Sequence, residues 1–207
     1  PAKVAWEPAN SWGYIVAVED SDFTEVTRLE GNKIIPDDPT AYVNIVEGTG
    51  AAANITLAAD TTTIVCLAQT TEGGTSPATI DLQGTRTLAV DGIVAEATTG
   101  ALTIGTAPGD GTLQSAVSGI FVQNDSDNAM TINADIADGA GATAVFKAGA
   151  GALILAGDNT HTGTTEVSAG RLIARTDTAL GGTAGGTTVD DGATLELDGG
   201  LTIGSEA

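Results

Sequence analysis

Apolar residues recur in this chain as short runs that alternate with polar residues and are set off by Gly, Asp, Asn and Thr. From residue 45 onward the series begins with Asn54-Ile55-Thr56-Leu57 and ends with Leu201-Thr202-Ile203. A period of two is typical of β-strands, and no helical stripe of useful length competes with it. The pattern therefore predicts an all-β protein built from many short strands.

A corner unit repeats within the series. It places an apolar residue, two other residues, a glycine and then a leucine, as in Val167-Ser168-Ala169-Gly170-Arg171-Leu172 and again from Val189 to Leu195. Glycine suits a sharp corner, and repeated corners indicate coils stacked along an axis. An immunoglobulin-like sandwich is the rival, but it would want fewer and longer strands. A β-solenoid is favoured.

The composition changes near residue 45. Five of the seven aromatic residues and four of the six prolines lie before that point. We therefore expect residues 1–45 to form a strand-rich N-terminal cap or arm and residues 46–207 to form the solenoid repeat region.

The chain of 207 residues has a formal net charge of −20, which makes nucleic acids and anionic membrane surfaces poor partners. No stretch approaches the roughly 20 apolar residues of a transmembrane helix. The sequence begins at Pro1 without a leader, so we expect a processed mature protein or a fragment, with secretion as the expected route.

Residues 147–172 resemble the autotransporter-associated β-strand repeat, and the residues downstream resemble its usual continuation more weakly. The resemblance implies a right-handed parallel β-helix in a secreted or surface-displayed bacterial protein, with the repeat as a stalk or transport-assisting module. His161 departs from the pattern, which has tyrosine there. The motif positions, to which the resemblance gives a structural role, are Gly149, Gly151, Leu153, Leu155, Gly157, Asn159, Thr160, Thr162, Gly163, Val167, Gly170 and Leu172.

His161 is the only histidine, and one hypothesis makes it a catalytic base with Asp158 and Ser168. The alternative is a structural ring that replaces the tyrosine of the turn, and this reading is preferred. The sole cysteine, Cys66, lies in an apolar run and is read as a small buried side chain. One cysteine and one histidine do not make a zinc site.

Acidic turns raise the question of calcium, which takes six to eight oxygen ligands. Asp125 and Asp127 are the best pair, but the glycine of an EF-hand loop is missing after them. Solvated acidic turns are the preferred interpretation, with a weak calcium site at this pair as the alternative. No cofactor is expected.

Three classes of function remain. The preferred one is an extracellular structural protein, not an enzyme, whose rods self-associate head-to-tail into a filament or surface fibre. Only four residues follow Ile203, so we expect more chain or another subunit to cover the last coil, with Trp6, Trp12, Leu201 and Ile203 as candidate contacts. The alternatives are an adhesin-like module that binds a host or glycan target and, third, a polysaccharide-active β-helix enzyme.

Overall fold

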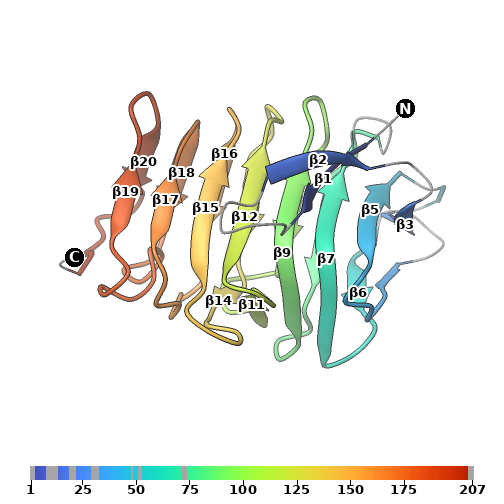
Figure 1. Ribbon diagram of the computed structural model, residues 1–207, viewed down its shortest axis with the longest axis horizontal. Coiled ribbons are helices and arrows are strands. Elements are labelled where there is room, and N and C mark those ends of the chain that lie inside the picture. Colours follow the sequence, from blue (N-terminus) through green and yellow to red (C-terminus); the bar gives the residue numbers. More distant parts are fainter. Residues whose placement is uncertain are drawn as a thin grey trace.

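The chain winds into successive coils, each of which adds one strand to the smaller of two facing sheets and one or two strands to the larger (Figure 1). This computed structural model describes residues 3–7, 14–18, 22–28, 33–47, 49–50, 53–70 and 74–204. Apart from β1 and β2, every pair of neighbouring strands in the described residues is parallel. The predicted all-β solenoid is confirmed.

The larger sheet has ten strands, eight of which form one continuous path in coil order, with β11 and β14 beside it. Its strands are β3 (Phe23–Thr27), β5 (Tyr42–Val46), β7 (Thr61–Gln69), β9 (Thr87–Ala95), β11 (Thr112–Gln114), β12 (Gly119–Asn124), β14 (Asp135–Ile136), β15 (Ala144–Ala148), β17 (Thr165–Val167) and β19 (Thr187–Val189).

The smaller sheet has eight strands, also stacked in coil order. Register partners in successive coils are separated by as few as 19 residues, as between Leu153 and Leu172. The largest separation is 29 residues, between Gly92 and Phe121 in the larger sheet. The eight strands are β4 (Ile34–Ile35), β6 (Ile55–Leu57), β8 (Ala78–Asp81), β10 (Leu102–Ile104), β13 (Met130–Ile132), β16 (Ala152–Leu155), β18 (Arg171–Ala174) and β20 (Thr194–Leu197).

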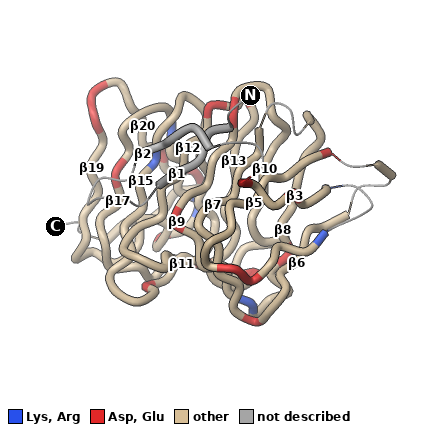
Figure 2. The backbone as a smooth tube through the Cα atoms, turned by 45° about the vertical axis from the view of Figure 1, so that its right-hand side comes forward, with Lys and Arg blue, Asp and Glu red and all other residues tan. Residues whose placement is uncertain are grey.

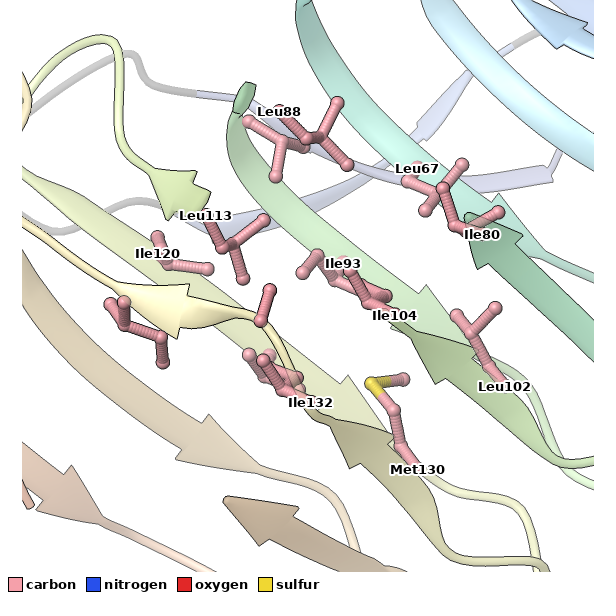
Figure 3. Close-up of a cluster of buried hydrophobic side chains, with 14 of the residues drawn as sticks. Leu67, Ile80, Leu88, Ile93, Leu102, Ile104, Leu113, Ile120, Met130 and Ile132 are labelled. Atoms are coloured by element: carbon pink, nitrogen blue, oxygen red, sulfur yellow. The ribbon is translucent and has the colours of Figure 1, made fainter. Parts of the chain in front are cut away.

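The core is an aliphatic column between the two sheets. Alternate residues of each strand point inward, so every coil delivers its Val, Ile and Leu side chains to the same interior. Figure 3 shows Leu67 of the larger sheet beside Ile80 of the smaller one, and Ile93 beside Ile104; all four side chains are fully buried. Burial of this kind contributes about 25 cal/mol for each Å² of apolar surface, which makes the column the main source of stability.

The parallel pairing begins before the shift in composition near residue 45. β3 pairs with β5 and β4 pairs with β6, so residues 23–46 already belong to the two sheets. Two of the aromatic residues there, Phe23 and Tyr42, are register partners whose rings meet edge to face at 6.0 Å. These two rings form a local cluster on the first described coils.

A two-stranded antiparallel ribbon stands apart from the coils. It consists of β1 (Lys3–Glu7) and β2 (Tyr14–Val18), which pair with each other and with no other described strand. β1 lies against β7 and β9, and Figure 1 shows the ribbon crossing the larger sheet there. Within the described residues no helix has the length and apolar character to cross a bilayer.

Candidate functional site

A buried lysine lies at the first corner of the coil that carries the sequence motif. Lys147 is the inward residue of β15 between the core positions of neighbouring coils, and it is 1% exposed. Its Nζ donates to the carbonyl oxygens of Ala148 (2.7 Å), Gly149 (2.8 Å) and Ala169 (3.1 Å). Burial lowers the pKa of Lys147 to about 8, partly offset by the Asp125 carboxylate. The ammonium ties two successive corners together.

The motif glycines allow these corners to stack. Gly170 has φ of 65°, and a Cβ there would collide with the carbonyl oxygens of Gly149, Ala150 and Gly151 in the coil before. Gly149 also has positive φ, at 78°. The four motif aliphatics, Leu153, Leu155, Val167 and Leu172, are fully buried in the core column.

Asn159 holds three coils in register at the second corner. Its Oδ1 accepts the backbone N–H of Ile136 (2.8 Å), and its Nδ2 donates to the carbonyl of Ala179 (2.6 Å). The side chain is 2% exposed, so both halves of the amide replace water contacts that folding removes. Thr160 and Gly163 continue the turn with backbone bonds to the coil before, at Ile136 and Thr143.

His161 is fully buried within this turn. Its Nε2 lies 3.2 Å from the Thr165 hydroxyl, which itself donates to the Leu180 carbonyl. The hydroxyl proton is thus committed to Leu180, so the imidazole must carry its proton on Nε2, and Nδ1 has no partner in the described residues. Burial lowers the pKa of His161, against weaker opposing effects of the Asp138 carboxylate and the Ile136 backbone. The ring is neutral and closely packed, since a Cβ on Gly181 would lie 2.5 Å from Nε2.

The candidate catalytic partners of His161, Asp158 and Ser168, form hydrogen bonds with other residues. Ser168 donates its hydroxyl to the carbonyl of Lys147, at the other corner of the coil. Asp158 is exposed and accepts a hydrogen bond from Thr178. Among the described contacts, the side chain that meets the imidazole is Thr165, whose own proton is already donated.

Asp125 and Asp127 are brought together in a polar recess of about 290 Å³ between two corners. Arg171 also lines the recess, and a guanidinium there opposes a cation. Asp125 already accepts hydrogen bonds from the Gln123 amide (2.5 Å) and the Ala150 N–H (3.3 Å). No group of three or more His, Cys, Asp or Glu residues suited to a metal occurs in the described part of the chain.

Acidic side chains have a second arrangement that the sequence did not reveal. Figure 2 shows many Asp and Glu residues at the bends of the backbone. Seven aspartates in the described ranges accept a backbone N–H from a residue 23 to 26 positions away, in the adjacent coil. We call them the inter-coil carboxylates: Asp37, Asp91, Asp110, Asp125, Asp135, Asp138 and Asp177.

Hydrogen bonding controls the protonation of two inter-coil carboxylates. Burial alone would raise the pKa of Asp110, but the N–H groups of Thr106 and Gly84 outweigh it and the pKa falls. The N–H of Thr143 and both donors of Thr162 likewise lower the pKa of Asp138. The inter-coil carboxylates therefore have a structural role.

The candidate subunit contacts fall in two places. Leu201 and Ile203 are partly buried and pack against the end of the core column. Trp6 lies in β1, and Trp12 lies outside the described residues. The ribbon rests on the larger sheet at β7 and β9, so in this structure it does not cover the last coil.

Fold and corner geometry together define a parallel β-solenoid whose best-formed coil spans the motif. Residues 145–174 match the passenger-associated transport repeat, which confirms the resemblance seen in the sequence. No curated protein and no solved structure matches the chain. The match covers residues 145–174 of the chain, and this repeat within a solenoid fold is similar to the passenger modules of autotransporters.

Proposed function

We propose that the protein is a non-catalytic structural module, secreted or displayed on a bacterial surface, whose rods join head-to-tail into a filament. The repeat match supports the location, because such repeats occur in passenger segments carried out of the cell. The head-to-tail contact is supported by exposed apolar side chains on the last described coil.

Two core positions of the last described coil are exposed. Leu197 of β20 is 49% exposed, whereas Ala174, its register partner one coil earlier, is fully buried. Val189 of β19 is 39% exposed, and its partner Val167 is fully buried. Both side chains lie where the next coil would rest. A coil from a second copy would bury them and pair with the outer edge of β20, beyond which no described strand lies.

Charge opposes this contact, because each copy carries a net charge of −20. Salt screens such repulsion, and divalent cations screen it more strongly. Assembly is therefore expected to increase with ionic strength. Calcium is expected to act only as a counter-ion, since the proposed role needs no cofactor.

The environment of His161 supports a role without catalysis. A neutral imidazole that is fully buried and donates to an already committed hydroxyl lacks both access to substrate and a nucleophile to activate. An adhesin-like role remains the second candidate, and a glycan or host-surface binding screen with a saturable hit would favour it.

Sedimentation of single-residue variants tests the end-to-end contact. Leu197→Asp places a charge on the open end of the core and should abolish assembly at high ionic strength. Val117→Asp is the matched control, because Val117 is equally exposed, at 48%, but lies in a loop away from the last coil. Assembly by both variants, or by neither, would contradict a contact through β20.

A further inference from the structure

The outer face of the larger sheet carries an apolar surface whose centre is buried. Leu67 and Ile93 point into the core column, so Cys66, Ala68 and Val94, next to them along β7 and β9, point outward. These three outward side chains are nevertheless at most 2% exposed. We call their cluster the outer patch: Phe23, Tyr42, Val65, Cys66, Ala68 and Val94.

The register explains the shape of the outer patch. One row of partners crosses six strands, with small residues, Cys66 and Gly92, at its centre. Aromatic pairs stand on either side: Phe23 with Tyr42, and Phe121 stacked on Phe146 with ring centroids 4.4 Å apart. The row runs Phe23, Tyr42, Cys66, Gly92, Phe121, Phe146.

The ribbon is the element that lies against the centre of this row, since β1 contacts β7 and β9. Among the described strands, the ribbon pairs with none of the solenoid, so it could leave without breaking the hydrogen bonds of either sheet. Asn44 adds a polar feature: it is fully buried beside Ala68, and its Nδ2 has no acceptor in the described residues.

We propose that the outer patch is an interaction surface for a two-stranded ribbon, and that the ribbon of a second copy can occupy it in exchange for the chain's own. Ribbon and patch are present on every copy, and the contacts in an exchanged pair are the same as those within one chain. The balance between the two arrangements therefore depends only on the protein concentration relative to the effective concentration of the chain's own ribbon. A short connection holds the chain's own ribbon at an effective concentration on the order of mM, so exchange needs comparable protein concentrations or a vacant patch. This dimer is closed and is independent of the end-to-end contact proposed above.

The buried thiol of Cys66 makes the exchange measurable, because it is the only cysteine. The acceptor is the full chain with Ala5→Pro, which breaks the β1–β2 ladder where Ala5 faces Val16. The donor is the full chain with Cys66→Ser and Ala68→Asp, which has an intact ribbon, a blocked patch and no thiol. Ala2→Pro, before β1, is the control for proline itself.

The readout is the rate at which an aromatic disulfide reagent labels Cys66. We expect Ala5→Pro to raise the rate by about tenfold or more over the unmodified chain, because labelling follows the fraction of time the site is open. Ala2→Pro should leave it unchanged. Added donor should slow labelling of the acceptor saturably, and a donor that also carries Ala5→Pro should not.

Two results would overturn the proposal. One is slow labelling in Ala5→Pro and in a second ribbon variant, Val16→Pro, while circular dichroism shows the solenoid intact. The other is fast labelling that saturating donor leaves unchanged. A general loss of fold is recognised by the dichroism signal, and Val16→Pro then supplies the acceptor.

Discussion

Replacing Asp138 by alanine tests whether the inter-coil carboxylates hold neighbouring coils together. Oδ1 of Asp138 accepts the N–H groups of Thr143 (2.8 Å) and Thr162 (2.9 Å), and Oδ2 accepts the Thr162 hydroxyl (2.7 Å). The first bond closes a turn within one coil, and the other two join that coil to the next. Asp138→Ala removes all three without changing the backbone.

The expected loss follows from the number and exposure of these bonds. A hydrogen bond to a charged group contributes about 1.5–3 kcal/mol when buried. Asp138 is only half-buried and water can replace the lost acceptor, so the sum is discounted to about 1–3 kcal/mol for the side chain. This free energy of unfolding is measured by urea denaturation followed by circular dichroism at neutral pH. Asp191→Ala is the control, because Asp191 is exposed and accepts no hydrogen bond in the described contacts; it should change stability by less than about 0.5 kcal/mol.

The pH dependence of the same pair sharpens the test. The pKa of Asp138 is lower in the folded protein than its ordinary value of 3.8. Its stabilisation is therefore complete above that value and is lost as pH falls through the folded pKa. The difference between the unmodified chain and Asp138→Ala should shrink in acid. Equal stability at neutral pH, or a difference that persists in strong acid, would refute the reasoning.

Three further variants probe the motif coil. The unmodified chain should lose stability as pH falls below about 6.5, because the pKa of the buried imidazole is lowered and the unfolded state takes up the proton first. His161→Phe should remove this loss. Equal pH profiles of the melting temperature for the two proteins would contradict the prediction. The unmodified chain should gain stability between pH about 8 and about 10, because the buried amine has lost its proton there and the unfolded lysine still holds one. Lys147→Met should remove this gain. A gain of the same size in the variant would count against the prediction. Gly170→Ala should lower the free energy of unfolding by about 3 kcal/mol or more, because the strain of a positive φ and the collision with backbone atoms add up. Gly192→Ala, where φ is positive but the space is open, should lower it by about 1 kcal/mol. Equal losses in urea unfolding would show that the backbone at the Gly170 corner moves to accommodate the methyl group.

The local pattern predicted the fold because every coil of a solenoid repeats the same short pattern of alternating strands and corner glycines. Strand alternation and corner glycines such as Gly170 act within a few residues, and stacking then multiplies them. The coil length of 19 to 29 residues was less accessible, because insertions at the bends change the spacing without changing the strands. The pairing of β3 with β5 was equally hard to infer, because the aromatic side chains of Phe23 and Tyr42 pack on the outside of these coils.

The site was harder to predict than the fold, because its partners are mostly backbone atoms. Asp138 and Asn159 bind N–H and C=O groups in other coils, and a backbone group leaves no residue-specific trace in a sequence. Lys147 had one available signal, a charged residue at an inward position of an alternating strand. The depth of His161 could not be inferred, since it depends on Gly181 in the following coil.

The central proposal is that rods stack end to end through the open last coil. Electron microscopy combined with fibre diffraction of the full chain at high ionic strength tests it most directly. We predict long fibres one solenoid wide, with a reflection near 4.8 Å along the fibre axis, because stacked coils continue the strand spacing from one copy to the next. Isolated rods at every concentration, or fibres in which this spacing lies across the axis, would contradict end-to-end stacking.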